Sequence, residues 1–547
     1  MVALALILTV VLLVVRNGQV MNADEGAVLI QAQVHHTTGG WVMHPDPHLD
    51  PTGKFFGVHL GDGSGTDRYP FVRPPIYPLA VGLLLPHGGL DLVMAAHLAA
   101  LLVAALGVGM LTEHLRQGRG VQAFWLAGLL SPLFFDGYWV IAHVISAAAA
   151  VWATYAVLRL LEEDTPIRWV AVWLGGLLTA VVFRNEAALF GAALAFGTLV
   201  MIRRDAWRRP VGLSAVSLMT TAFGYEVMKV WQSAVKGWAP TRLYSPTYAG
   251  GWLDGRVRSI QQTILSPSQS GGSAGAVSLL AALLVIAAVV ALRSGKVSPS
   301  LTVGLAAGGV ALSIVRLFMP ADLVSGLLMA APLIVVAAVT IPIADLRRPG
   351  VRLIAAVAAT SAVLVAATQS GDGGGSEWGG RYFHVALPLV IVLAALSLDR
   401  LLAAGRVAGR VVLGGLAVSL LLSVQGVQVD RAARRVADTV VTTAWNAADQ
   451  TSSARQRGGP VIVSTWVAGG RFSWQRFTDG RLLTFEFDRD GAELARNLRE
   501  SGVDEFVLLV TPGRDHALAA LGGTFERERT TRLGSNGWQV VVVRRVR

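Results

Sequence analysis

Two adjacent carboxylates, Asp24 and Glu25, follow the first apolar stretch of the chain and open a long polar segment. A carboxylate in a partly desolvated site can accept the proton of a hydroxyl group as that hydroxyl attacks an anomeric carbon. Acidic residues directly after a membrane span can equally serve as a solvated stop. The pair alone therefore leaves two interpretations open: a general base for glycosyl transfer, or solvated residues that end a membrane span.

Arginines at the ends of later apolar segments could bind an anionic leaving group. Arg184 and Arg381 stand at such ends, and Arg73 precedes the second apolar segment. A guanidinium group can bind phosphate oxygens in a bidentate fork and stabilise charge that develops on a leaving group. The alternative for each arginine is an anchor that reaches toward lipid headgroups.

Histidines gather in the polar segment 17–72, which also contains several aspartates. Imidazole and carboxylate groups are suitable ligands for a divalent metal, which Asp24 or Glu25 could help to hold. No HExxH spacing is present, so a solvated loop or an acceptor pocket remains the alternative. The histidines of this segment are His35, His36, His44, His48 and His59.

The amino-acid composition of the chain is typical of a membrane protein. Of 547 residues, 53% are hydrophobic and 15% are charged, whereas soluble domains have about 25% charged residues. The net charge of +11 comes from Lys and Arg clusters between apolar runs, which is typical of cytoplasmic loops rather than of nucleic-acid binding. Cysteine is absent, which excludes disulfides and thiol-based sites.

Apolar segments of spanning length predict about 13 transmembrane helices. Residues 1–15 form an uncleaved first span, because they lack a basic leader and a cleavage site. The segment 17–72 is expected to be an ordered extramembrane loop, since prolines at its end would break a spanning helix. The later spans are expected at 76–113, 121–136, 137–161, 169–183, 187–202, 211–230, 273–292, 299–319, 322–343, 351–368, 382–402 and 411–428.

The basic loops fall on one side of the membrane if 76–113 crosses it once, and that side is the cytoplasm. The same parity places the 17–72 loop, the corner at 184–186, the end of the 371–381 loop and the C-terminus outside. All candidate residues would then face the extracytoplasmic side.

Charged residues appear throughout the chain from about residue 430, which predicts a second domain. Strands are expected at 461–464, 482–487, 505–510 and 538–543, with a helix at 491–500. We therefore predict a transmembrane catalytic domain at 1–429 and an extracytoplasmic α/β domain at 430–547. The latter lacks GxGxxG, so a structural or substrate-docking role is favoured over nucleotide binding.

Several short motifs occur in an order that resembles the GT-C superfamily of polytopic membrane glycosyltransferases, which includes protein O-mannosyltransferases, aminoarabinose transferases and actinobacterial arabinosyl and mannosyl transferases. The segment 131–135 and His143 are similar to a segment of actinobacterial members, although Ala142 stands where a Glu is usual. Asn185 replaces the usual Pro of an Arg-Pro-Glu corner. The remaining motifs are Asp24-Glu25-Gly26, Arg73-Pro74-Pro75-Ile76-Tyr77-Pro78 and Trp378-Gly379-Gly380-Arg381-Tyr382.

This resemblance implies inverting transfer of a sugar from a polyprenyl-phosphate donor to an envelope glycan, lipid or protein on the outer face of the plasma membrane. It implies that Asp24 is the general base and that Glu25 orients the acceptor or binds a divalent metal. The phosphate would be bound by Arg381, Arg184 and Arg73. Substrate contacts would come from His143, Glu186, Tyr382 and Trp378.

Two other functions remain open at this stage. A transporter or flippase for lipid-linked sugars would suit many spans, but such proteins usually contain repeated halves, which this sequence does not show. A non-catalytic protein that binds envelope glycans would not need the carboxylate pair.

Overall fold

The computed structural model describes residues 1–57, 61–62, 68–69, 75–162, 167–202, 206–235, 251–266, 272–319, 324, 326–368, 378–455, 459–466, 469–485, 487–533 and 537–546. The chain forms two compact units. The first contains residues 1–14, 94–229 and 245–430, and the second contains 15–93, 230–244 and 431–547. The predicted division into 1–429 and 430–547 stays a prediction.

Helices build the first unit, and four described helices, α1, α3, α9 and α18, have residues in both units. Among the described residues, seven helices are long and apolar enough to cross a membrane, namely α3, α6, α9, α11, α12, α16 and α18. The exact number of spans, about 13 from the sequence, stays a prediction. The helices are α1 (Val2–Val15), α3 (Ile76–Leu115), α4 (Gly120–Leu129), α5 (Leu133–Asp136), α6 (His143–Glu162), α7 (Ile167–Phe183), α8 (Ala187–Leu199), α9 (Arg208–Val235), α10 (Gly251–Ile260), the π-helix η1 (Gln261–Leu265), α11 (Ser273–Ser294), α12 (Pro299–Leu317), α13 (Leu327–Ala330), α14 (Pro332–Val339), α15 (Ile343–Leu346), α16 (Pro349–Thr368), the 3-10 helix η2 (Arg381–Phe383), α17 (Leu387–Ala403) and α18 (Arg406–Ala448).

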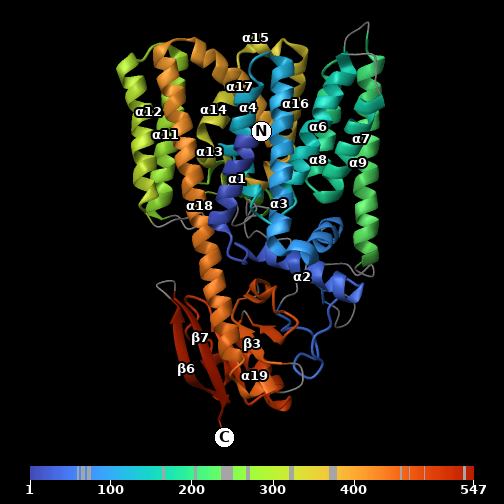
Figure 1. Cartoon of the computed structure of the whole chain (residues 1–547), viewed down its shortest axis with the longest axis vertical. Helices are drawn as coiled ribbons and strands as arrows, with labels where there is room; N and C mark the ends of the chain where they lie inside the picture. Colours follow the sequence, from blue (N-terminus) through green and yellow to red (C-terminus); the bar gives the residue numbers. More distant parts are fainter. Residues whose placement is uncertain are drawn as a thin grey trace. The chain divides into compact units, whose positions relative to one another are not determined.

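The long helices pack in pairs whose contact faces are apolar. Helices α6 and α7 lie side by side, as do α11 and α12 (Figure 1). Charged side chains pair between α17 and the loop that joins α3 to α4. The buried carboxylate of Asp399 on α17 pairs with Arg116, at 2.5 Å, and with Arg119. Arg400 pairs with Asp345 in the same way. The arginines that the sequence assigns to cytoplasmic loops are thus partly neutralised by neighbouring acids.

Two of the predicted spans are interrupted. The segment predicted to be helical over 121–136 ends at Leu129 and resumes only for α5, because Pro132 cannot donate to a continuing helix. Residues 137–142, predicted to begin the next span, are buried but not helical, and α6 begins at His143. The predicted span 322–343 is likewise divided into α13 and α14, with Pro332 at the first position of α14.

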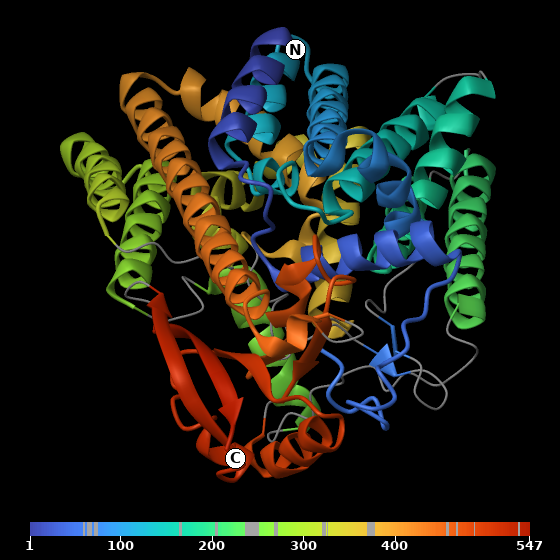
Figure 2. The ribbon, with the colours of Figure 1, turned by 60° about the horizontal axis from the view of Figure 1, so that its bottom comes forward.

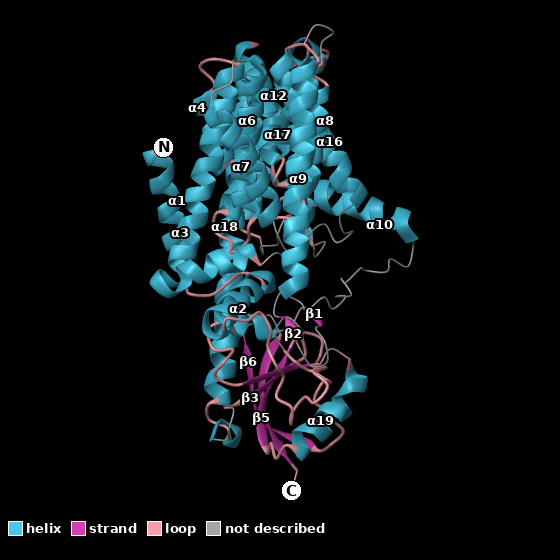
Figure 3. Ribbon diagram, turned by 90° about the vertical axis from the view of Figure 1, so that its right-hand side faces the viewer, coloured by secondary structure: helices cyan, strands magenta, loops and turns pink. Residues whose placement is uncertain are grey.

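The second unit contains a five-stranded sheet, which confirms the predicted C-terminal α/β fold. The strand order is β4-β3-β5-β7-β6, with β4, β3 and β5 parallel and with β7 antiparallel to both β5 and β6. Figure 3 shows the strands with α19 beside them, and Figure 2 shows the β6 and β7 pair in red. The elements are β3 (Val461–Ser464), β4 (Arg481–Thr484), β5 (Glu505–Val510), β6 (Phe525–Leu533), β7 (Trp538–Arg545), α19 (Gly491–Glu500) and the 3-10 helices η3 (Ser452–Arg455), η4 (Gly469–Ser473), η5 (Asp488–Asp490) and η6 (Ala519–Leu521).

Strand β6 was not predicted, because its sequence Phe-Glu-Arg-Glu-Arg-Thr-Thr-Arg-Leu carries charges in place of apolar alternation. It lies at the edge of the sheet, where charged side chains protect the free edge from pairing with another chain. The prediction for 482–487 was too long at its end, since β4 stops at Thr484. The strands β3, β5 and β7 and the helix α19 match the predicted segments closely.

Residues of the first polar segment also belong to this second unit. The segment contains a 16-residue helix, α2 (Ala23–Thr38), and two short strands, β1 (Gly61–Asp62) and β2 (Arg68–Tyr69). Its extramembrane position stays a prediction. The amide of Thr484 donates to the carbonyl of Phe55 at 2.6 Å, which places this segment against β4. Leu49 and Phe55 are buried in the same hydrophobic core as the sheet.

Candidate active site

The segment from Asn22 to Gly26 forms the first turn of α2. Asn22 is extended and caps the helix, since its side-chain oxygen accepts a hydrogen bond from the Glu25 amide at 3.0 Å. Gly26 lies against η4, and a Cβ atom at this position would stand 2.2 Å from the carbonyl oxygen of Arg471. The motif therefore combines a helix cap with a position at which only glycine fits.

Glu25 points into the protein rather than into solvent. Its side chain is 0% exposed and accepts a hydrogen bond from the Met21 amide at 3.3 Å. The carboxylate also lies 3.9 Å from the guanidinium of Arg434, which is itself 0% exposed and donates to the carbonyl of Gln19 at 2.7 Å. This geometry ties the start of α2 to α18.

Asp24 lies one residue earlier in the same turn and is only partly buried. The dipole of α2 favours negative charge at this end of the helix. Of the two predicted catalytic carboxylates, Asp24 is therefore the more accessible.

Two glycines with positive φ set up a second candidate group in the first unit. Gly379 and Gly380 have φ values of +73° and +76°, and a Cβ atom at either position would stand 2.4 Å from its nearest neighbour. These neighbours are Pro132, just before α5, and the carbonyl of Thr263 in η1. The turn brings Arg381 into η2, where the guanidinium is mostly buried and lies 5.3 Å from the centre of the Tyr382 ring.

Several predicted substrate-binding residues gather around this turn. Trp378 is buried and packs on Phe135 of α5 at 4.9 Å between ring centres. His143 at the start of α6 meets His384 edge to face, with ring centres 5.8 Å apart. The structure thus brings Trp378, Arg381, Tyr382 and His143 into one region.

Asp136 and His384 form a buried pair beside the turn. The Nδ1 atom of His384 lies 2.7 Å from Oδ2 of Asp136, and its Nε2 atom lies 3.0 Å from the carbonyl oxygen of Gly379. Both side chains are 0% exposed.

Arg184 and Glu186 pair with each other. Their side chains are buried and lie 2.5 Å apart, at the corner between α7 and α8. Glu186 offsets the positive charge of Arg184. Phosphate binding by Arg184 and substrate binding by Glu186 stay predictions, and Arg73 lies outside the described residues.

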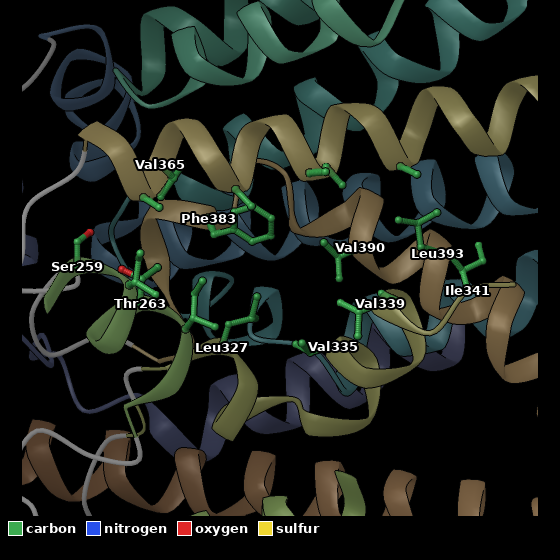
Figure 4. A pocket seen from close by; sticks show the side chains of 18 of the residues that line it. Ser259, Thr263, Leu327, Val335, Val339, Ile341, Val365, Phe383, Val390 and Leu393 are labelled. Atoms are coloured by element: carbon green, nitrogen blue, oxygen red, sulfur yellow. The ribbon is translucent and has the colours of Figure 1, made fainter. Parts of the chain in front are cut away.

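An apolar cavity of about 380 Å³ adjoins the Gly379–Gly380 turn. Its walls come from α10, η1, α13, α14, α16 and α17, and Phe383 of η2 points into it (Figure 4). Ser259 and Thr263 lie at one end, and Ile341 and Leu393 lie at the other. The hydroxyls of Ser259 and Thr263 are the polar groups of the lining, and neither has a hydrogen-bond partner among the described residues.

The predicted metal-ligating residues are dispersed in the part of the chain that the structure describes. His35 stacks on Trp41, with ring centres 4.1 Å apart, and Asp50 is buried and accepts from the Phe55 amide. No three His, Asp or Glu side chains among the described residues are grouped so as to hold a metal ion. His59 lies outside those residues.

Solved structures with the same architecture are known. ArnT from Cupriavidus metallidurans, an aminoarabinose transferase, aligns in its undecaprenyl-phosphate complex over 99% of this chain and 97% of its own, with 15% identity and a TM-score of 0.52. Its apo form aligns equally well, with 14% identity and a TM-score of 0.52. The apo oligosaccharyltransferase of Archaeoglobus fulgidus aligns over 98% of this chain and 74% of its own, with 12% identity and a TM-score of 0.51.

The chain shares the fold of ArnT over nearly its whole length. No protein-family model matches the sequence, and no curated protein matches it significantly. This fold and the long apolar helices identify a multi-pass membrane protein, as the sequence predicts.

Sequence reasoning did not select Asp136 or the pair that it forms. His384 and Asp136 stand 248 positions apart in the chain, so the sequence does not show that they pair. A charged residue between Phe135 and Gly137 in an otherwise apolar run was the available signal, since such residues in membrane proteins usually have buried partners.

Proposed function

We propose that the protein is a membrane glycosyltransferase that moves a sugar from a polyprenyl-phosphate donor to an acceptor of the cell envelope. The observation that carries this proposal is the apolar cavity lined by Phe383, two residues after Arg381, in a chain with the GT-C fold. ArnT of the same fold binds undecaprenyl phosphate. A long hydrocarbon chain suits a cavity whose lining is apolar apart from Ser259 and Thr263.

Arg381 supplies the charge that the donor phosphate requires. It follows directly on the two glycines that hold the turn against Thr263, and Phe383 of the same turn lines the cavity. A donor whose chain occupies the cavity therefore presents its phosphate toward the Arg381 turn. The guanidinium stabilises the charge on the phosphate as it leaves.

The reaction is a single displacement at the anomeric carbon. The acceptor hydroxyl attacks that carbon, its proton passes to Asp24, and the bond from the anomeric carbon to the phosphate oxygen breaks. The sugar is transferred with inversion, and polyprenyl phosphate is released with the bonding electron pair. Glu25 supports this step by holding the first turn of α2, because its carboxylate is already engaged with Met21.

The reaction takes place on the extracytoplasmic face of the plasma membrane. The distribution of basic loops supports this orientation, and the fold supports a lipid-linked donor rather than a nucleotide sugar. Trp378, Tyr382, His143, Arg184 and Glu186 are proposed to contact substrate. Arg73 remains a candidate for the donor phosphate.

Release of polyprenyl phosphate tests the proposal. Purified protein in nanodiscs is given a panel of polyprenyl-phosphate sugars with crude envelope acceptor, beside Asp24→Asn and the control Asp438→Asn on α18. Release from one donor that is lost only in Asp24→Asn supports the enzyme and identifies the sugar. If folded wild type releases nothing but moves a lipid-linked sugar between leaflets, the protein is a transporter and the proposal fails.

A further inference from the structure

The Asp136–His384 pair has no role in the displacement described above, yet it occupies a fully buried position beside Arg381. Asp136 ends α5, and His384 follows η2 directly. The two side chains are 2.7 Å apart and 0% exposed. Ionisable groups in such a place are costly unless they are paired, so the pair has to be explained.

The hydrogen bonds of His384 determine how the ring is held. The carbonyl of Gly379 can only accept, so Nε2 carries a proton and donates it at 3.0 Å. Nδ1 and Oδ2 of Asp136 then share one further proton, which resides on either atom. In both cases Asp136 orients the imidazole so that Nε2 points at Gly379.

The imidazole also links the two ends of the backbone turn that contains Arg381. It connects His384 to the carbonyl of Gly379, five residues earlier. Within this loop the Phe383 amide donates to the Gly380 carbonyl at 2.9 Å, and the His384 amide donates to the Arg381 carbonyl at 3.1 Å. Both glycines of the turn have positive φ and close neighbours, so the backbone has little room for another conformation.

We propose that Asp136 and His384 are positioning residues that fix the Gly379–Gly380 turn and thereby aim the Arg381 guanidinium at the phosphate of a polyprenyl-phosphate donor. This inference rests on the proposed function, because it requires Arg381 to bind that phosphate. The pair acts through the turn and has no contact with substrate. Figure 4 shows Phe383 of this turn beside the cavity.

Binding of two probes to the purified full-length protein tests the inference. Undecaprenyl phosphate and undecaprenol share the hydrocarbon chain, and only the first carries a phosphate. Wild type is expected to prefer undecaprenyl phosphate. Asp136→Ala is expected to reduce that preference at least about tenfold, the effect of losing one hydrogen bond to a charged group, with undecaprenol binding unchanged. General damage to the fold would weaken both probes together.

A double-mutant cycle separates positioning from a direct effect. Arg381→Gln removes the guanidinium, so adding Asp136→Ala to it is expected to cost no further affinity for undecaprenyl phosphate. Asp136→Asn is expected to restore most of the preference, because its amide can donate to Nδ1 while Nε2 continues to donate to Gly379. If Asp136→Ala does not fold, His384→Gln makes the same test from the other side of the pair.

The outcomes distinguish this inference from the proposed function. A phosphate preference that depends on Arg381 but not on Asp136 or His384 overturns the positioning role and leaves the function intact. A wild type that binds the two probes equally overturns phosphate binding by Arg381, and the positioning role fails with it. Additive losses in the double variant show that Asp136 acts independently of Arg381, which also overturns the inference.

Discussion

Glu25 and Asp24 are adjacent carboxylates, and the structure predicts that their loss affects different properties, stability for Glu25 and turnover for Asp24. Glu25→Gln keeps the shape of the side chain and removes the negative charge that faces Arg434 at 3.9 Å. Both side chains are 0% exposed, so bulk water does not replace the lost charge. Asp24→Asn alters a partly buried side chain beside it. We expect Glu25→Gln to lower stability and Asp24→Asn to abolish turnover.

The size of the stability loss follows from the geometry. Breaking a buried ion pair costs about 3–5 kcal/mol, and a distance of 3.9 Å favours the lower end, about 3 kcal/mol. At roughly 2–4 °C per kcal/mol for a unit of this size, the Tm should fall by roughly 6–12 °C. The cap itself is retained, because Asn22 accepts from the backbone amide of residue 25.

Thermal unfolding of the purified protein in detergent measures the Tm, and polyprenyl-phosphate release measures turnover at a temperature where all variants are folded. Arg434→Met provides the control for the ion pair. If the lost charge pair is the cause, Glu25→Gln adds little further destabilisation in the Arg434→Met background. The reasoning is refuted if Glu25→Gln unfolds like wild type, or if Asp24→Asn is the variant with the large fall in Tm.

Three further predictions follow from the turn, the cavity and the sheet. Gly380→Ala should lower the stability of the fold by about 1–3 kcal/mol through backbone strain, and it should weaken undecaprenyl-phosphate binding. The control Gly175→Ala on α7, where a Cβ atom meets open space, should do neither. Equal binding by both variants contradicts this prediction. Ala358→Phe should fill part of the cavity and raise the KM for long-chain donors but not for short-chain donors, and an equal rise for both would argue against a chain site. Hydrogen bonds to Glu493 and Asp490 raise the pKa of Lys54 above its ordinary value of 10.5. The Tm of Lys54→Met should therefore be lower than that of wild type at about pH 8, and this difference should disappear as pH rises through the raised pKa. A difference that persists in alkali excludes this contact as its source.

Much of the fold could be predicted because it depends on local signals. Long apolar runs predict membrane helices, and the strands β3 and β5 have continuous apolar sequences that suit buried positions in a sheet. The missed strand β6 shows the limit of this approach, because its charges reflect its place at the sheet edge and only the tertiary structure defines that edge. The breaks at Pro132 and Pro332 were readable in principle, but the length of the apolar runs concealed them.

Part of the candidate site could likewise be predicted from the sequence, and part depends on contacts between distant residues. Asp24, Arg381 and the glycines before it stand out in the sequence, because charge next to apolar runs and paired glycines are visible without a structure. The different environments of Asp24 and Glu25 are not visible there, since the Glu25 contact with Arg434 joins positions 409 residues apart. The same holds for Asp136 and His384.

The sequence by itself determined that this is a membrane protein with acids and arginines at the ends of apolar helices and with a C-terminal α/β fold. Its local patterns suffice for this, because hydrophobic length and periodicity act within one element at a time. Only the tertiary structure decided which carboxylate is buried against a guanidinium, which histidine orients the Arg381 turn and where an apolar cavity lies. Each of these depends on side chains from distant elements, and their burial and pairing are set by packing.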